Sequence, residues 1–412
     1  MKNKIYDTLI IGAGIYGINI ARLLTKKYPE MKIALIESNK TFFNNNSVFN
    51  SGVLHSGIYY KPDSLKAKFC VTGQKDLIQF CDENKLFINK CGKLIVGTKE
   101  EYKIIEKLYN NGLKNDVNLS LVDLKTAQEL DKNIYTDAEK LIYIPSTSIV
   151  SPKQVYETIL NQINRNNNID FVFSSKIINL TNKDKFLESQ ENFNDCFKFL
   201  TENKESILSK RVINCSGPSS DKIAKMFGLS KNYQNVFLKA IYHKYKLEKE
   251  KMPRILVYPI PGPFSLGLHL TMEDENILKF GPSVDFPFLS PKEMSYNYKE
   301  CFKKNMEFML AITAFKNFGQ VLTEFRNNSY TFGIERLKNI YKNSDVKSFT
   351  YIEKKVLLRT PAINLNTGSF EGDFIIEHST NNIHLINFQS PSFTCFMPLS
   401  RHILEIFENN MN

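Results

Sequence analysis

The strongest constraint on the fold is a glycine-rich turn between a buried strand and a helix. Gly12-Ala13-Gly14-Ile15-Tyr16-Gly17 ends the apolar run 6–12 and precedes apolar residues at helical spacing over 15–24. A second apolar run, 31–37, ends at Glu37, about 20 residues after Gly17. Strand, turn, helix and strand in this order form a βαβ unit. The pattern predicts an α/β chain with a Rossmann-type dinucleotide-binding domain.

Each residue of the turn has a physical role in that prediction. Gly12 permits the tight turn, Gly14 lets the backbone approach a pyrophosphate, and Gly17 lets the helix pack against the strand. The N–H groups at the start of the helix attract phosphate, and Glu37 is placed to accept hydrogen bonds from ribose hydroxyls. A glycine-rich turn in another kind of α/β protein is the alternative.

Two further segments favour FAD over NAD as the cofactor. The late strand 211–217 (RVINCSG) ends at Ser216 and Gly217, where the backbone can come close to a dinucleotide. The stretch 50–60 (NSGVLHSGIYY) has spaced glycines with polar residues between them, and Asn50, Ser51 and Gly52 open it. Both patterns are common in flavoproteins.

Charge and cysteine content narrow the partners and the compartment. The net charge of +11 raises the question of nucleic acid, but Lys and Arg are scattered among Asp and Glu, and no nucleic-acid partner is expected. Attraction to anionic lipid or to an acidic substrate stays open. No CxxC pair occurs, which argues against a disulfide framework and a structural metal and favours a reducing, cytoplasmic compartment. The cysteines are Cys70, Cys81, Cys91, Cys196, Cys215, Cys301 and Cys395.

Changes of pattern along the chain predict a discontinuous domain organisation. We expect the FAD-binding domain to comprise 1–90, 145–230 and 346–412. Alternating β segments with turns predict a mostly antiparallel substrate domain over 91–144 and 231–345, with a helical insertion at 299–341. A hairpin is expected over 375–386 and a final helix over 399–408.

Five segments spread over the chain carry a recognisable set of motifs. They are NSGVLHSGIYYKPDSLKAKFC at 50–70, YPIPGP at 258–263, LGLHLT at 266–271, FGP at 280–282 and NFQSPSFT at 387–394. These motifs resemble, nearly end to end, those of the L-2-hydroxyglutarate dehydrogenases and oxidases, a family of the D-amino-acid-oxidase-like FAD superfamily. The resemblance implies FAD, a D-amino-acid-oxidase-like fold and oxidation of an L-2-hydroxy acid, with L-2-hydroxyglutarate as the first candidate.

The sequence departs from the family pattern where substrate is expected. Ser47-Val-Phe49 replaces a Thr-Gly-His triplet, and Lys239-Ala-Ile-Tyr242 replaces an Arg-Gly-Glu-Tyr motif. Leu358, rather than glycine, precedes Arg359. These departures leave the fold expectation intact and the exact hydroxy acid open.

Oxidation of a 2-hydroxy acid needs a hydride acceptor, a base and a cation. We expect the hydride of C2 to pass to flavin N5, with His269 or His55 taking the hydroxyl proton. Arg359 suits the carboxylate because its planar fork binds bidentately. Tyr60 and Tyr258 are candidate hydroxyl donors. Pro391, Ser392 and Thr394 are expected in a loop over the flavin ring, whereas His384 and His402 are expected to be structural.

Apolar residues from Phe302 to Phe325 recur at near-helical spacing, with lysines at 303, 304 and 316. Such a helix either packs on its own domain or lies on a membrane surface. The family resemblance favours peripheral contact at the inner face of the membrane, with a quinone or another molecule as electron acceptor. The rival functions are oxidation of an amine, amino acid or glycerol 3-phosphate on the same scaffold and, more remotely, a flavin-dependent nucleic-acid-modifying or nucleic-acid-binding protein.

Overall fold

The computed structural model describes residues 4–43, 45–181, 196–262, 267–274, 276–285, 302–303, 306, 326–327, 329–342 and 346–410. The chain divides into two compact units. Unit 1 comprises Met1–Phe49, Pro152–Asn235 and Ala362–Asn412, and unit 2 comprises Asn50–Ser151 and Val236–Pro361.

Unit 1 is built on an eight-stranded sheet whose centre is parallel. Its order is β10-β11-β12-β1-β2-β9, with β22 also paired to β12 and β21 to β22. The strands are β1 (Ile5–Ile11), β2 (Ile33–Ile36), β9 (Ile169–Val172), β10 (Ile177–Thr181), β11 (Phe197–Thr201), β12 (Ser206–Asn214), β21 (Ile376–Ser379) and β22 (Asn382–Leu385). A parallel sheet buried on both faces requires continuous apolar strands, and β2 is buried throughout.

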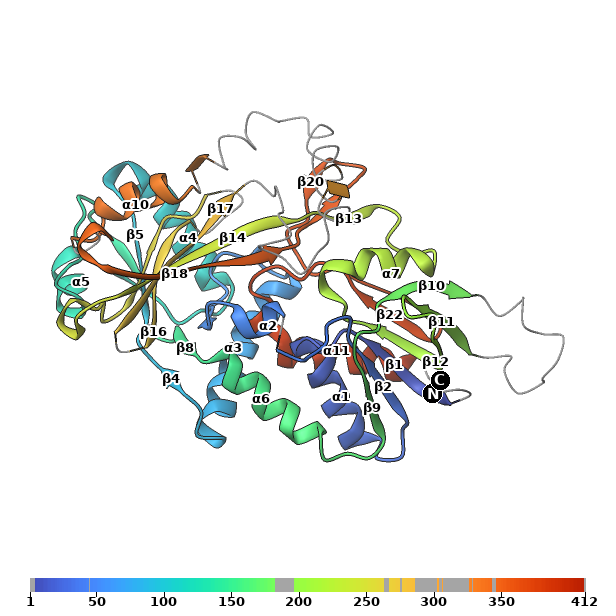
Figure 1. Cartoon of the computed structure of the whole chain (residues 1–412). Coiled ribbons are helices and arrows are strands. Elements are labelled where there is room, and N and C mark those ends of the chain that lie inside the picture. The colour runs from blue at the N-terminus through green and yellow to red at the C-terminus, as the bar shows by residue number, and fades with distance from the viewer. Residues whose placement is uncertain are drawn as a thin grey trace, which may run out of the picture. The chain divides into compact units, whose positions relative to one another are not determined.

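Helices cover this sheet. Helix α1 contacts α6 and α11, whereas α7 contacts β12 and β22 and lies above these strands in Figure 1. The helices are α1 (Ile15–Lys27), α2 (Asn46–Phe49), α6 (Pro152–Ile163), α7 (Ser220–Met226) and α11 (Ser392–Asn409). A small sheet, β13-β19-β20, completes the unit with Tyr233–Asn235, Ala362–Asn364 and Ser369–Phe370.

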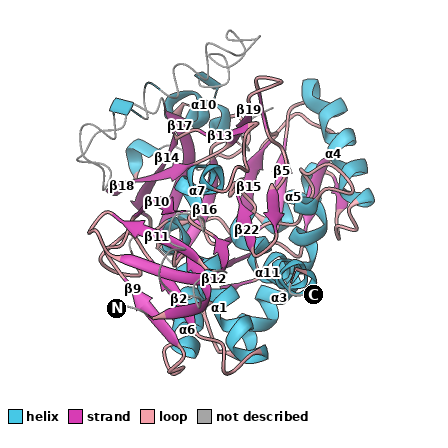
Figure 2. Cartoon of the chain, turned by 90° about the vertical axis from the view of Figure 1, so that its right-hand side faces the viewer, coloured by secondary structure: helices cyan, strands magenta, loops and turns pink. Residues whose placement is uncertain are grey.

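Unit 2 is built on a second, mostly antiparallel sheet of eight strands in the order β18-β14-β17-β16-β15-β5-β7-β6 (Figure 2). The strands are β5 (Lys93–Val96), β6 (Ser120–Val122), β7 (Leu141–Ile144), β14 (Leu238–Lys246), β15 (Leu256–Pro259), β16 (His269–Asp274), β17 (Ile277–Asp285) and β18 (Thr350–Arg359). A three-stranded sheet joins β3 (Val53–Leu54), β8 (Ser148–Val150) and β4 (Ile88–Asn89). Helices α3 (Leu65–Glu83), α4 (Tyr102–Lys114), α5 (Leu124–Leu130) and α10 (Tyr330–Lys338) belong to this unit.

The predicted fold class is confirmed, but the boundaries of the two units differ from the expected ones, and strand pairing accounts for the two largest differences. Residues 50–90 were expected in the FAD-binding domain, yet β3 and β4 both pair with β8 of unit 2. Residues 346–361 were also expected there, yet β18 pairs with β14 along nearly its whole length. Backbone hydrogen bonds of a sheet decided both assignments.

Two helical expectations also differ from the structure. The final helix begins at Ser392 rather than at 399, and it continues through Pro398. Of the insertion expected at 299–341, α10 is helical, and most of the remainder, including the apolar stripe from Met309 to Phe325, lies outside the described residues.

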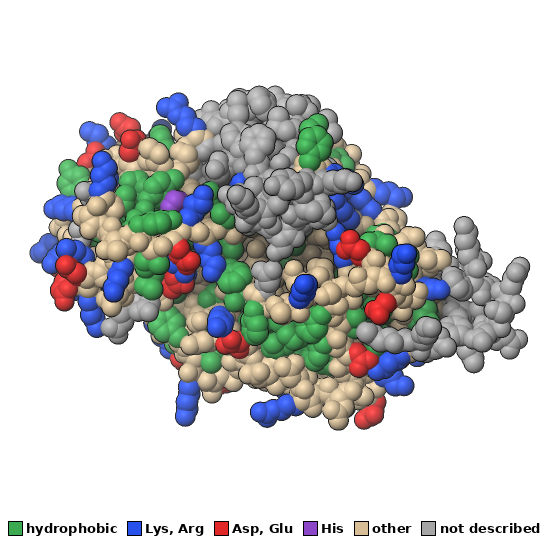
Figure 3. Space-filling view, in the orientation of Figure 1, with side chains coloured by type: hydrophobic (Ala, Val, Ile, Leu, Met, Phe, Trp, Pro, Cys, Tyr) green, Lys and Arg blue, Asp and Glu red, His purple; other side chains and the backbone are tan. Residues whose placement is uncertain are grey.

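The surface shows no single basic region on the part of the described chain drawn in Figure 3, where Lys and Arg are scattered among acidic side chains. Among the described residues, no helix combines the length and apolar character needed to cross a bilayer.

Candidate active site

The glycine turn of unit 1 is shaped by contacts that exclude side chains. Gly12 has φ +99°, and a Cβ there would lie 2.6 Å from the carbonyl oxygen of Cys215. A Cβ on Gly17 would lie 1.9 Å from the carbonyl oxygen of Gly12. Because these obstacles are backbone atoms, they cannot rotate away. Glycine at both positions therefore lets the end of β1 approach both α1 and the end of β12.

Gly14 is the N-cap of α1, and no acidic residue lies in the first helical turn. The Ile15 N–H donates to Ser47 Oγ at 2.9 Å, and the Ala13 N–H donates to Glu37 Oε2 at 3.1 Å. Glu37 is buried at the end of β2, and its other oxygen accepts from the Asn39 N–H. A helix N-terminus beside a fixed carboxylate fits the pyrophosphate and ribose of a dinucleotide.

Strand β12 brings the second predicted segment to the same turn. The Cys215 N–H donates to the Ile11 carbonyl, and Ser216 and Gly217 follow, with φ +55° at Gly217. Asn214 Oδ1 accepts from the Ser216 hydroxyl at 2.7 Å. These parallel strands end at one edge of the sheet, where a dinucleotide is expected to bind.

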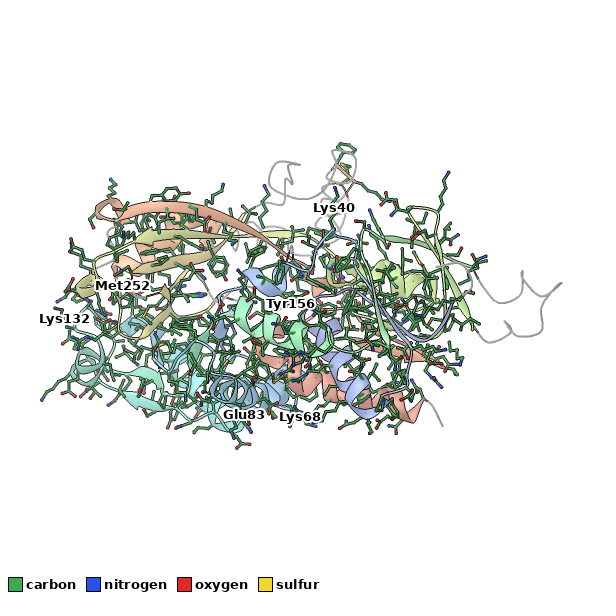
Figure 4. All side chains as sticks on the ribbon, turned by 60° about the horizontal axis from the view of Figure 1, so that its bottom comes forward. Lys40, Lys68, Glu83, Lys132, Tyr156 and Met252 are labelled. Carbon is green, nitrogen blue, oxygen red and sulfur yellow. The ribbon has the colours of Figure 1, made fainter. Side chains whose placement is uncertain are left out.

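Residues that sequence reasoning missed also shape the turn. Tyr156, labelled in Figure 4, projects from α6 and donates its hydroxyl to the Ala13 carbonyl. Tyr16 donates to the Ser392 carbonyl at 2.8 Å. Pro391 is the N-cap of α11, and Ser392 and Thr394 lie in its first turn rather than in a loop as expected. A buried Tyr at helical spacing gave no signal beyond ordinary core packing.

Unit 2 holds the predicted catalytic residues, together with a lysine that sequence reasoning left out. His269, on β16, stacks on Tyr258 with ring centroids 3.9 Å apart. Lys93 Nζ lies 5.0 Å from the Tyr258 ring centroid and 4.8 Å from that of Tyr59. Thr271 follows His269 by two residues and so shares its face of the strand. We call Tyr59, Lys93, Tyr258, His269 and Thr271 the buried polar cluster.

Several polar atoms of this cluster have no hydrogen-bond partner among the described residues. They are Tyr59 Oη, Lys93 Nζ, Tyr258 Oη and Thr271 Oγ1. A buried polar group left without a partner costs about 1–3 kcal/mol, so several together indicate a place for a polar ligand. A lysine at the start of the otherwise apolar strand KLIV was the sequence signal for this site.

The histidines of unit 2 are held neutral. Burial, then Lys93, His269 and Arg359, lowers the pKa of His55 to about 3. Burial, with Lys93 and Arg359, lowers the pKa of His269 to about 3 against the raising effect of its bond to Gly267. His269 Nδ1 lies 2.9 Å from the Gly267 carbonyl oxygen. A carbonyl only accepts, so Nδ1 carries the proton and Nε2 is the free base.

Arg359 is electrostatically coupled to the same groups. Burial lowers its pKa, and Tyr242 and Tyr60 raise it. Burial raises the pKa of Tyr242 to about 12, against the opposing effects of Arg359 and a hydrogen bond with Ser51. Tyr242 is a further residue that the sequence did not single out, since it lies in the motif that departs from the family pattern. Gly52 and Asn50 lie near Ser51, where the Gly52 N–H donates to Asn50 Oδ1.

The two histidines that were expected to be structural have other surroundings. His384 is buried in the sheet of unit 1, where its ring nitrogens lie 3.1 Å from Asn214 Nδ2 and 3.1 Å from Asn382 Oδ1. His402 lies near the surface, with Nδ1 3.3 Å from Glu405. The structural roles expected for His384 and His402 stay predictions.

Comparison with known proteins is consistent across the chain. The family described as FAD dependent oxidoreductase matches residues 7–317. The mitochondrial L-2-hydroxyglutarate dehydrogenase of Dictyostelium discoideum is 31% identical, over 99% of this chain and 94% of the relative. The L-2-hydroxyglutarate dehydrogenase of Indibacter alkaliphilus is 28% identical, over 97% of this chain and 98% of the relative.

Solved structures agree with the fold. The L-alpha-glycerophosphate oxidase of Mycoplasma pneumoniae, which has FAD bound, superposes with a TM-score of 0.75 at 18% identity, over 98% of this chain and 95% of that one. The glycine oxidase of Geobacillus kaustophilus gives a TM-score of 0.73 at 12% identity, over the same shares. At these identities the likeness is one of fold.

Gly14→Val tests the dinucleotide turn. Its Cβ would lie 3.3 Å from Ser47 Oγ, and the remaining side chain would enter the space expected for pyrophosphate. We expect the purified variant to have lost its flavin absorbance. Gly372→Val is the matched control, because a Cβ there meets nothing within 4 Å. Full flavin content in Gly14→Val would contradict the assignment, and circular dichroism of both variants would reveal a folding defect.

Proposed function

Because this chain belongs to the FAD-dependent oxidoreductases and, among them, to the L-2-hydroxyglutarate dehydrogenase family, we propose that it oxidises an L-2-hydroxy acid to the 2-oxo acid. Family membership makes the protein an enzyme with FAD as its cofactor. L-2-hydroxyglutarate is the first candidate substrate, because the relatives that this chain matches over nearly their whole length are L-2-hydroxyglutarate dehydrogenases.

The observation that carries this proposal is that two buried neutral histidines in unit 2 lie within the electrostatic influence of two cations, the buried Lys93 and the partly buried Arg359. A 2-hydroxy acid presents a carboxylate and a hydroxyl on adjacent carbons. Arg359 and Lys93 supply positive charge, and both act on His55 and His269. An anionic substrate would offset the cost of burying those charges.

Each residue then has a defined task. Arg359 holds the carboxylate beside C2, and Tyr258 and Tyr60 donate to substrate oxygens. His269 accepts the hydroxyl proton at Nε2, which its bond to Gly267 leaves free, and His55 is the second candidate for this role. When bound, FAD supplies the hydride acceptor, N5, for the hydrogen that leaves C2. In unit 1, Gly12, Gly14, Gly17, Glu37, Ser216 and Gly217 would hold it, with Pro391, Ser392 and Thr394 at the start of α11.

Anaerobic reduction of the flavin tests the substrate class. We expect L-2-hydroxyglutarate to bleach the flavin in stopped flow, and its D-enantiomer, L-glutamate and glycerol 3-phosphate to do so far more slowly. The fixed cation and base select both the configuration and the hydroxyl group. Bleaching by L-glutamate or glycerol 3-phosphate, with no response to any 2-hydroxy acid, would move the enzyme to the rival reaction class.

Replacement of the histidines identifies the base. Loss of a general base typically lowers the rate by about 10²- to 10⁴-fold. We therefore expect His269→Ala to lower kcat in that range while KM changes less, and His384→Ala, a buried histidine of unit 1, to leave kcat near wild type. A wild-type rate of flavin reduction in His269→Ala, with a large loss in His55→Ala, would assign the role of base to His55.

We also propose peripheral contact with a membrane and a quinone as electron acceptor. The support is the apolar stripe with lysines, of which Phe302 is 69% and Met306 44% exposed. Surface apolar residues beside cations suit an anionic lipid surface.

Liposome sedimentation tests this contact. Binding to anionic vesicles should weaken as salt rises, because charges are screened over about 8 Å at physiological ionic strength. Phe302→Ser together with Met306→Ser should reduce binding, whereas the exposed apolar control Phe87→Ser should not. Equal partitioning of wild type and both variants at low salt would refute a membrane role for the stripe.

A further inference from the structure

Lys93 is an unusual residue for a buried strand. Its side chain is 0% exposed, and Nζ has no hydrogen-bond partner among the described residues. Its neighbours Leu94 and Val96 belong to the apolar core of the sheet. Burial of a lysine without a carboxylate partner is costly. An anionic ligand that pairs with Lys93 would offset this cost and would explain why a lysine occupies this position.

The contacts of Lys93 place its ammonium group among the aromatic rings of the buried polar cluster. Pairing of β5 with β15 places Lys93 opposite Leu256 and Ile95 opposite Tyr258. Side chains two residues apart share a face of a strand, and Nζ lies over the rings of Tyr59 and Tyr258. Aromatic faces stabilise a cation without neutralising it, so the charge stays available to an anion.

Lys93 also differs from Lys279, a buried lysine of the same sheet whose carboxylate partner is Glu273. Lys279 Nζ lies 2.9 Å from Glu273 Oε1, and Glu273 also binds Lys244 at 2.9 Å. That network is internally paired and needs no ligand. The contrast separates a lysine that completes the fold from one whose partner comes from outside.

Two cations, the buried Lys93 and the partly buried Arg359, match the charge of a dicarboxylate. Arg359 has been assigned to the carboxylate beside the reacting carbon, and a second carboxylate at the far end of the substrate needs a cation of its own. Building on the function proposed above, we propose that Lys93 binds this distal carboxylate and makes the enzyme selective for 2-hydroxy dicarboxylates over monocarboxylates. Lys93 is thus a specificity residue, distinct from the base.

This assignment predicts a pH dependence of binding. Burial lowers the pKa of Lys93 to about 7, opposed by the Cys70 thiol. Its other titratable or charged neighbours are His55, His269, Arg359, Tyr59 and Tyr258. A carboxylate favours the protonated amine, so binding takes up a proton when Lys93 is neutral. Affinity for a dicarboxylate should therefore be highest below pH 7 and weaken as pH rises above it.

The experiment compares dicarboxylate with monocarboxylate in the FAD-loaded enzyme. We expect Lys93→Met to lower kcat/KM for L-2-hydroxyglutarate roughly 10- to 100-fold, the loss of one charge-assisted hydrogen bond. The kcat/KM for L-2-hydroxybutyrate should change little. Arg359→Lys should weaken both substrates, and Lys279→Met, the matched buried control, should leave their ratio unchanged.

Calorimetric titration with glutarate provides a readout that needs no turnover. Wild type should bind it more weakly at pH 8 than at pH 6, and Lys93→Met should bind it weakly at both. Equal losses for both hydroxy acids would make Lys93 the base and overturn the proposal, as would unchanged glutarate binding in Lys93→Met. If wild type oxidises no 2-hydroxy acid, the proposed function fails, while the glutarate titration still tests Lys93.

The stability of Lys93→Met separates binding from a structural role. Removal of a buried charge that has no partner should leave thermal stability equal or higher, whereas Lys279→Met strands Glu273 with one cation fewer and should lower Tm. A marked loss of stability in Lys93→Met would assign the lysine to the fold and overturn the proposal.

Discussion

The pairing of β1 with β12 is the interaction on which unit 1 depends. These strands lie far apart in the chain, at Ile5–Ile11 and Ser206–Asn214, and their parallel register runs from Ile5 opposite Leu208 to Ile11 opposite Asn214. The register carries the backbone of Cys215 against Gly12, where a single methyl group would collide with it. The turn, the helix that follows it and the late segment at Ser216 are positioned by this one ladder of hydrogen bonds.

In unit 2 the corresponding constraint is the cost of burying polar groups. Protein interiors tolerate such groups when they are paired, as in the network of Lys244, Glu273 and Lys279. The buried polar cluster departs from that rule at several atoms at once. Departures of this kind concentrate at functional sites, because a site must keep donors and charges ready for its ligand. The neutral histidines follow from the same environment, since low polarity and nearby cations both disfavour imidazolium.

Sequence reasoning succeeded where the signal was local and periodic. Apolar runs at 6–12 and 31–37, with the glycines between them, predicted β1, α1 and β2. It failed where pairing partners lie far apart in the chain. Nothing in residues 346–361 distinguishes a strand of the first sheet from one of the second, and their hydrogen bonds to β14 decided the matter. Likewise, Ser392 and Thr394 sit between a proline and an apolar stretch, which suits a loop or a helix start equally well.

By itself, the sequence determined that this protein has a dinucleotide-binding βαβ unit, that FAD is its cofactor and which family its motifs resemble. It did so because glycine spacing and apolar periodicity are local consequences of backbone geometry. Only the tertiary structure decided which polar side chains meet. In the sequence, Lys93 is marked only by its place at the start of an apolar run, and it becomes significant because β15 places Tyr258 beside it and β16 stacks His269 on that ring. Burial, which gives the lysine its need for an anion, is a property of packed strands rather than of any residue taken alone.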